Sequence, residues 1–206
     1  MDNRVRRAGA LCLAYAAIGI GLFLFKSGWL AIGLYHAGMM LYLVHRKRRI
    51  PPRLLWTGRR TAWFGLLPVG ALGGVAVVLL WPAVGLSADL NSLLSRYGLS
   101  GWKWTAFMVY FVLFHPVLEE LFWRGGLQHP SKVLRIEDAA FAGYHVFTML
   151  CFVRWPWALM SFFLLTGAAW AWRQSVRRTG GLFVAASSHV IADAAIVQAA
   201  CAILSK

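Results

Sequence analysis

Residues 104–123 read WTAFMVYFVLFHPVLEELFW, an apolar stretch that carries two adjacent carboxylates near its end. No Asp, Glu, Lys or Arg occurs before Glu119, and the apolar character resumes after Glu120. A helix of about 20 apolar residues is long enough to cross the hydrocarbon core of a bilayer. Both carboxylates would then lie inside the membrane, where ionisable side chains are costly and usually functional. The stretch therefore predicts a membrane-spanning helix that carries part of a functional site.

The rest of the chain has the same character. Of its 206 residues, 60% are hydrophobic and 14% are charged, whereas soluble domains have about 25% charged residues. This composition excludes a soluble enzyme and a disordered chain, and three cysteines do not make a disulfide scaffold. Six further runs lack charged residues, apart from Asp193 in the last of them: 8–25, 27–44, 61–88, 139–153, 155–172 and 179–205.

We therefore predict an all-α, polytopic membrane helix bundle of about seven transmembrane helices. It forms a single domain over 1–206, with accessory spans in 1–103 and catalytic spans in 104–206. A short amphipathic helix near 88–97 is expected to lie in the membrane interface, with Ser87 as its cap, because its apolar residues recur at helical spacing. Gly70 and Gly74 form a GxxxG pattern, which favours close contact between helices.

The basic residues predict the orientation of the chain. Its net charge is +14, and the Lys and Arg residues fall between the apolar runs. With seven spans, 16 of them lie on one side and 5 on the other. Cytoplasmic loops carry the excess of Lys and Arg, so we expect a cytoplasmic N-terminus and an external C-terminus. This distribution of charge indicates a multi-pass membrane protein, in contact with lipid and with no nucleic acid as partner. The excess of Arg over Lys, 16 to 5, suggests a bacterial source, so we expect the inner (cell) membrane.

The polar residues within the predicted spans are candidate functional groups. They include three pairs spaced four residues apart: Glu120–Arg124, Phe141–His145 and His189–Asp193. Helical rise places Glu119, His145 and His189 at roughly 6, 9 and 12 Å below the cytoplasmic surface. Three separate helices thus bring a Glu and two His to a similar depth. The alternative, purely structural interpretation is that each side chain only forms a hydrogen bond to a neighbouring helix. We favour this interpretation for His36 and His115.

This set of side chains could hydrolyse a peptide bond without a covalent nucleophile. A Glu beside a His can hold a water and take its proton. A second His can donate to the oxyanion that forms when the water attacks a carbonyl. The same Glu119, His145 and His189 could instead bind zinc as a His₂Glu site, although the HExxH pattern of soluble zinc proteases is absent.

Three motifs in this region resemble those of the CPBP family of intramembrane proteases, which includes the CAAX prenyl endopeptidases and bacteriocin-processing proteins. They are EELFWR at 119–124 (EExxxR), FAGYH at 141–145 (FxxxH) and HVIAD at 189–193 (HxxxD). Their order, each on its own predicted span, carries the resemblance, which covers about 104–200. The resemblance implies an intramembrane endopeptidase that acts on a membrane-associated protein or peptide. In small bacterial members, the substrate can be a C-terminal sorting tag.

The resemblance also implies roles for single residues. Glu119 and His145 would activate the water, and His189 and Asp193 would form the oxyanion side. Family members carry Asn or Asp at the last position, and an ionised Asp193 cannot donate a hydrogen bond, so it is expected to orient His189 or to stay protonated. Glu120, Arg124 and Phe141 would support the site. We expect a glutamic-type mechanism without a cofactor, with zinc as the alternative.

Two other functions remain open at this stage. The buried carboxylates and histidines could relay protons or ions in a non-proteolytic membrane protein. A pair of histidines could also ligate haem, but the neighbouring carboxylates argue against that. An absorbance spectrum would decide whether the protein binds haem.

Overall fold

The computed structural model describes residues 3–45, 54, 57, 67–86, 89–127 and 131–205. Its helices, in chain order, are α1 Asn3–Ile18, the π-helical η1 Gly19–Leu24, α2 Gly28–His45, α3 Leu67–Val84, α4 Leu90–Arg96, α5 Trp102–Leu113, α6 His115–Glu120, the π-helical η3 Leu121–Leu127, α7 Ile136–Met149, α8 Trp155–Thr179 and α9 Phe183–Leu204. Over these residues there is no β-strand, only an isolated bridge between Gly85 and Val153. The predicted all-α fold class is confirmed.

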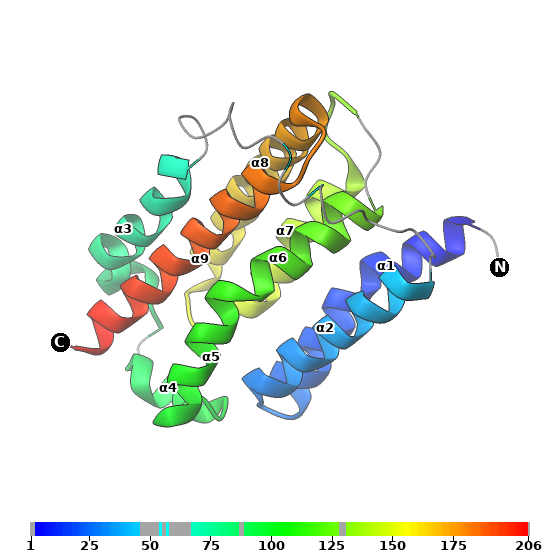
Figure 1. Ribbon diagram of the computed structural model, residues 1–206. Helices are drawn as coiled ribbons and strands as arrows, with labels where there is room; N and C mark the ends of the chain where they lie inside the picture. The colour runs from blue at the N-terminus through cyan, green and yellow to red at the C-terminus, as the bar shows by residue number, and fades with distance from the viewer. Residues whose placement is uncertain are drawn as a thin grey trace.

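The helices run up and down in one bundle (Figure 1). Backbone hydrogen bonds join the connections at one end, from Gly28 to the Tyr97 carbonyl and from Leu86 to the Phe152 carbonyl. At the opposite end, Arg7 at the start of α1 pairs with Glu137 at the start of α7. Within the described residues, helical segments overlap the predicted spans.

Three of these segments are long and apolar enough to cross a membrane: Arg7–Leu24, Trp102–Leu127 and Phe183–Leu204. A shorter apolar helix covers Gly70–Val84. The chain is thus a membrane protein by the character of its helices. The number of crossings and the orientation remain predictions from the sequence.

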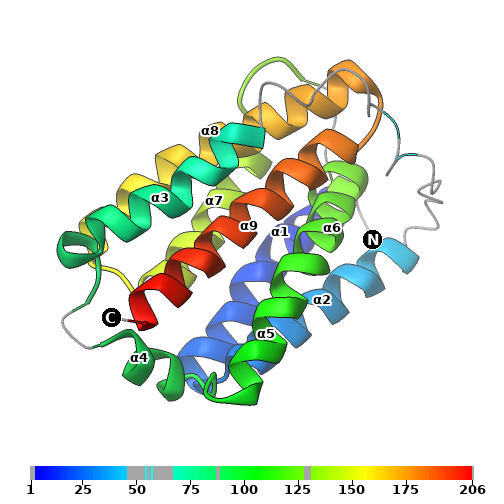
Figure 2. The ribbon, with the colours of Figure 1, turned by 60° about the vertical axis from the view of Figure 1, so that its left-hand side comes forward.

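The predicted close contact at the GxxxG pattern is present. Helix α3 lies alongside α9 (Figure 2). A Cβ atom at Gly70 would lie 2.9 Å from the carbonyl oxygen of Ser188, and one at Gly74 would overlap the backbone of Ala195. Gly73, one position away, faces open space. The two glycines let α3 approach α9, which carries part of the site.

The short amphipathic helix is α4, and its cap differs from the predicted one. Ser87 lies outside the described residues, whereas the Asp89 side chain accepts a hydrogen bond from the Ser92 amide at 2.9 Å. The Ser92 hydroxyl donates to the same carboxylate at 2.6 Å, and these bonds lower the pKa of Asp89. Gly98 ends the segment with a φ of +69°, a conformation that glycine adopts without strain.

Helix α8 extends past the predicted end of its span, residue 172, to Thr179. The prediction ended the span at the first charged residue, Arg173. In the structure Arg173 is buried, and its Nη2 lies 2.5 Å from Oδ2 of Asp138 on α7. Its guanidinium also donates to the backbone carbonyls of Ser131 and Val133. A paired charge is tolerated inside a helix bundle, so charge alone marked the boundary too early.

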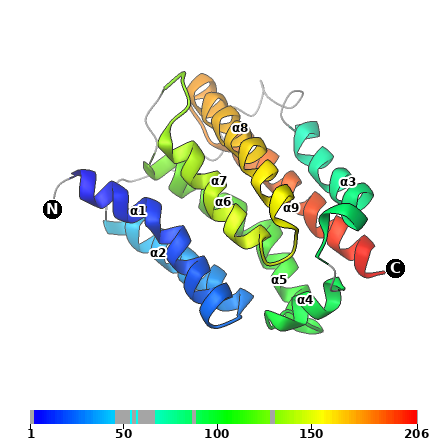
Figure 3. The ribbon, with the colours of Figure 1, turned by 180° about the vertical axis from the view of Figure 1, so that it is seen from behind.

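The stretch that carries the two adjacent carboxylates is not one uniform helix. Helix α5 ends at Leu113 and α6 begins at His115. Pro116 has no amide hydrogen to donate within the helix, which accounts for the break. The chain then continues as the π-helical η3 directly after Glu120, and π-helical turns are frequent at functional sites. Figure 3 shows this segment between the α1–α2 pair and α9.

Candidate active site

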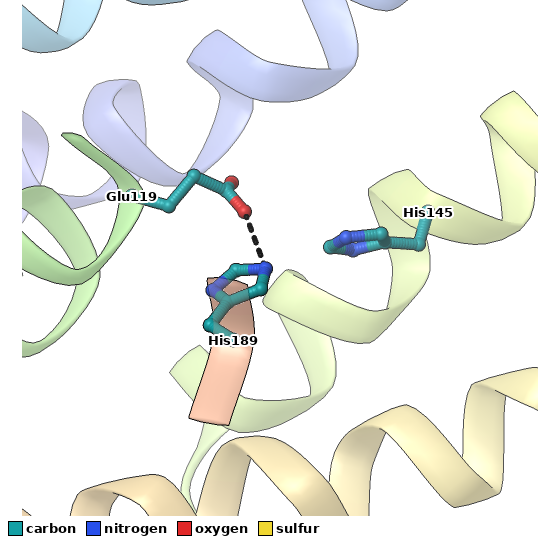
Figure 4. Close-up of side chains that lie close together, drawn as sticks. All are labelled: Glu119, His145 and His189. Atoms are coloured by element: carbon teal, nitrogen blue, oxygen red, sulfur yellow. Dashed lines mark ion pairs between the residues drawn. The ribbon is translucent and has the colours of Figure 1, made fainter. Parts of the chain in front are cut away.

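Three helices bring Glu119, His145 and His189 together, as their predicted depths suggested. Glu119 is on α6, His145 on α7 and His189 on α9, and the three side chains face one another (Figure 4). A carboxylate oxygen and one nitrogen from each ring lie within 4.8 Å of one another. Glu119 and His189 are buried and His145 is half-buried. Oε2 of Glu119 lies 3.6 Å from Nε2 of His189.

The two oxygens of Glu119 have different surroundings. Oε1 accepts hydrogen bonds from the hydroxyls of Tyr35 and Tyr144, and from Nε1 of Trp123 at 3.2 Å. Trp123 Nε1 also donates to the Tyr35 oxygen at 2.7 Å. Oε2 is buried and has no hydrogen-bond partner among the described residues. Three donors therefore fix the carboxylate through one oxygen and leave the other directed at the histidines.

The backbone determines which nitrogen of His145 carries the hydrogen. Nδ1 of His145 lies 2.8 Å from the carbonyl oxygen of Phe141, one turn earlier on α7. A carbonyl can only accept, so Nδ1 must donate, and this assigns the tautomer from the hydrogen-bond network. In the neutral ring, Nε2 then keeps its lone pair. Nε2 lies 3.1 Å from the Tyr144 hydroxyl, which already donates to Glu119. His145 thus presents a proton acceptor on the side of the site where Glu119 lies.

Glu120, rather than Asp193, is the nearest carboxylate to the His189 ring. Nδ1 of His189 lies 3.1 Å from Oε1 of Glu120. Nε2 lies 3.7 Å from Oδ1 of Asp193, beyond hydrogen-bond distance. Trp172 on α8 stacks on the ring, with centroids 4.5 Å apart and planes inclined by 21°. The predicted i,i+4 pair is therefore a loose contact, and the ring is oriented by Glu120 and Trp172.

The predicted pair of Glu120 and Arg124 is present in the interior. Arg124 Nη1 donates to Glu120 Oε1 at 2.9 Å, and both side chains are fully buried. The guanidinium carbon lies 4.3 Å from the Phe141 ring centroid and 5.1 Å from that of Trp172. Stacking on aromatic faces stabilises a desolvated cation. Arg124 and Phe141 thus support Glu120, which in turn holds His189.

Other residues of the site were not predicted as part of it. They are Tyr35, His36, His115, Trp123, Tyr144 and Trp172. Tyr144 immediately precedes His145 in the FxxxH motif, and Trp123 follows Glu119 by four residues, so helical spacing could have indicated both. His115 also precedes Glu119 by four residues, although the sequence alone favours a hydrogen bond between helices for it. Tyr35 and His36 lie on α2, where no motif marks them.

The donor set also fits zinc. Two imidazole nitrogens and a carboxylate oxygen are the ligands of a His₂Glu catalytic zinc site. In both rings Nδ1 is engaged by an acceptor, as is usual for zinc-bound histidines. Glu119, His145 and His189 would hold the ion, which would supply a Lewis acid and an acidified water.

Comparison with known protein families gives a match to the second half of the chain. Residues 101–195 match the family model described as type II CAAX prenyl endopeptidase Rce1-like. No curated protein and no solved structure matches the chain. The matched range contains the EExxxR, FxxxH and HxxxD motifs, whose side chains meet in the site described above. Over residues 101–195, the chain is therefore similar to the type II CAAX prenyl endopeptidases of the CPBP family.

Proposed function

We propose that this protein is an intramembrane endopeptidase in which Glu119 and His145 activate a water molecule to hydrolyse a peptide bond. The observation that carries the proposal is the asymmetry of the Glu119 carboxylate. Oε1 is held by three donors, while the buried Oε2 has no hydrogen-bond partner among the described residues and is directed at two histidines. Oε2 of Glu120 is also buried without a hydrogen-bond partner among the described residues, but Glu119 differs in that it contributes an oxygen to the cluster with nitrogens of His145 and His189.

In the proposed reaction, the water donates one hydrogen bond to Oε2 of Glu119 and the other to Nε2 of His145. The water oxygen attacks the peptide carbonyl carbon as its proton moves to Glu119. The C–N bond then breaks, and the proton on Glu119 passes to the departing amine nitrogen. The products are a new carboxyl group and a new amine, so one water is consumed for each bond cleaved.

His189 is proposed to stabilise the oxyanion. Its Nδ1 is occupied by Glu120 at 3.1 Å, so Nε2 is the atom that can face a substrate. In our proposal the ring is an imidazolium, and its Nε2–H donates to the carbonyl oxygen as negative charge develops there. Asp193 lies 3.7 Å from the same nitrogen and balances the charge of the ring. Arg124 does not reach the substrate in this account, because its side chain is buried against Glu120 and two aromatic rings.

We propose that the substrate is the C-terminal segment of a membrane-associated protein or peptide. The family supports activity on substrates of the CAAX type in general, in which a lipidated Cys lies near the C-terminus. The site is within the helix bundle, so the scissile segment must enter it from the membrane in an extended form. Processing of a C-terminal sorting tag is a specific form of the same reaction. We favour the mechanism without metal, and zinc content is predicted separately below.

The experiment uses the full chain, purified in detergent and mixed with an internally quenched peptide. The peptide ends in a farnesylated Cys-aliphatic-aliphatic-X sequence, and a second peptide carries a C-terminal transmembrane sorting tag. We expect cleavage of at least one of them, with one ¹⁸O atom from labelled water in the new carboxyl group. His145→Leu and His189→Leu should abolish cleavage, while His45→Leu, at an exposed position of α2, should not. Equal cleavage by all of these variants would contradict the proposed function.

A further inference from the structure

Two buried histidines outside the family motifs form a chain that ends at Glu119. His36 lies on α2 and His115 is the first residue of α6, and both are buried. His36 Nε2 lies 2.9 Å from His115 Nδ1. At the far end of the chain, His36 Nδ1 lies 2.5 Å from the hydroxyl of Tyr110 on α5. At the near end, His115 Nε2 lies 3.4 Å from Oε2 of Glu119.

We propose that His36 and His115 are positioning residues, which hold Oε2 of Glu119 in the orientation that receives the proton from water. The inference rests on the proposed function, since it concerns the oxygen to which the water would bind. It assigns a role to α2, which carries none of the three motifs. His36 and His115 touch neither substrate nor water in this account and act only through Glu119.

The hydrogen atoms of the chain have one arrangement that satisfies every group in its neutral form. The Tyr110 hydroxyl donates to His36 Nδ1, His36 Nε2–H donates to His115 Nδ1, and His115 Nε2–H is left facing the carboxylate. The reverse arrangement would place the lone pair of His115 Nε2 against Oε2 of Glu119, which is electrostatically unfavourable. The carboxylate thus determines the direction of the chain. In return, the chain places an N–H group 3.4 Å from Oε2, an oxygen that has no hydrogen-bond partner among the described residues.

The geometry around Glu119 explains why this contact matters for orientation. The three donors on Oε1 restrain one oxygen, but changes in the side-chain torsions of Glu119 could still displace Oε2 relative to that anchored oxygen. Among the described residues, Oε2 lies near two ring nitrogens, those of His115 and His189. His189 is needed at the oxyanion, so His115 is the group that can restrain Oε2 throughout the reaction. Its ring is itself held, because it stacks on Phe111 with centroids 4.7 Å apart.

Glutamine and leucine substitutions distinguish a positioning role from the alternatives. A glutamine side chain accepts at its oxygen and donates from its nitrogen, so it can replace either histidine in the chain without taking up a proton. Leucine removes the hydrogen bonds but suits a helix in an apolar interior. A misplacement of a reacting group by about 1 Å can cost on the order of 10²-fold in rate. We expect His36→Leu and His115→Leu each to lower kcat by about 10- to 100-fold, with little change in KM.

The experiment measures kcat and KM of the full chain on whichever of the two peptides it cleaves. His36→Gln and His115→Gln should recover most of the loss caused by leucine. The double leucine variant should be no slower than the slower single variant, because removing either link breaks the same chain. Tyr110→Phe removes the outermost donor at a half-buried position and should lower kcat by a smaller factor. His45→Leu serves as the control histidine on the same helix as His36.

Several results would overturn the inference. Wild-type kcat in His115→Leu or in Tyr110→Phe would show that Oε2 needs no such restraint. Glutamine variants as slow as the leucine variants, at equal thermal stability, would show that the histidines transfer protons rather than position Glu119. A loss confined to KM would place them in substrate binding. Failure of the proposed function itself is distinguishable, because Glu119→Gln would then cleave at the wild-type rate whatever His36 and His115 do.

Discussion

The Nδ1 atom of His189 lies 3.1 Å from Oε1 of Glu120, and this contact joins the second carboxylate of the EExxxR motif to the last helix. The same oxygen accepts from Nη1 of Arg124 at 2.9 Å. Glu120 thus has two partners on one oxygen, while Glu119 beside it keeps an oxygen directed at the site. The two adjacent carboxylates of the motif therefore have different environments, one held by a buried cation and the other by neutral donors.

Replacing Glu120 should affect folding more than replacing Glu119. Glu120→Ala leaves Arg124 as a buried, uncompensated charge, which typically costs 3–5 kcal/mol, so we expect a marked fall in the thermal midpoint in detergent. The cleavage rate of the residual folded protein should fall too, because His189 loses its partner at Nδ1. The matched comparison is Glu119→Gln, because the Glu119 carboxylate is not paired with an arginine side chain. An equal thermal midpoint for Glu120→Ala and the wild type would contradict this assignment.

Removing the tyrosine donors to Glu119 should slow the reaction without unfolding the protein. Tyr144→Phe and Tyr35→Phe each delete one hydroxyl that donates to Oε1. A hydrogen bond to a charged group contributes roughly 1.5–3 kcal/mol, so each variant should lose about 10- to 100-fold in kcat. Steady-state cleavage of the peptide checks this, with Tyr97→Phe as a control from outside the site. Wild-type kcat in both variants would show that Oε1 does not require these donors.

The close approach of α3 and α9 gives a prediction about stability with a control one residue away. A side chain at Gly74 would overlap the backbone of Ala195, whereas Gly73 has open space around it. Overpacking typically costs about 1–3 kcal/mol, so Gly74→Leu should lower the thermal midpoint in detergent. Gly73→Leu should leave the midpoint close to that of the wild type. Equal midpoints for the two variants would mean that α3 does not pack on α9 through Gly74.

Much of this arrangement could be predicted from the sequence because membrane helices separate charged from apolar residues sharply. The uncharged runs located most of the long helices, and the four-residue spacing located the Glu120–Arg124 pair. The meeting of Glu119, His145 and His189 followed from counting residues along three helices. These inferences needed only local spacing and the thickness of a bilayer.

The remainder depended on contacts between distant parts of the chain. Tyr35 reaches Glu119 across a separation of 84 residues, and His36 reaches His115 across 79. No local pattern indicates which face of α2 meets α6, since α2 is apolar on all sides. The charge of Arg173 ends an uncharged run and so predicts a helix end, yet Arg173 pairs with Asp138, 35 residues away, inside the bundle. Charges paired across helices are invisible to a search for uncharged runs.

Metal content should distinguish the two mechanisms that use these three residues. In the proposed mechanism, the purified protein contains no stoichiometric zinc, and chelators leave cleavage intact. Elemental analysis and peptide cleavage after chelation check this. Zinc is then added back to test whether any loss of cleavage is reversible. One zinc per chain, with activity lost on chelation and restored by zinc, would replace the glutamic mechanism by a metal-dependent one. The hydrogen-bond network around Glu119 would then serve to orient a ligand.

The most direct test of the whole account is the rate of peptide cleavage by Glu119→Gln under single-turnover conditions. Glutamine keeps the size of the side chain and can still bond Tyr35 and Tyr144, but it cannot take a proton from water. The account predicts a fall of about 10²-fold or more, with normal yield and an unchanged thermal midpoint. Asp89→Asn, at an exposed carboxylate outside the site, should cleave at the wild-type rate. Cleavage by Glu119→Gln at the rate of Asp89→Asn would contradict the assignment of Glu119 as the base.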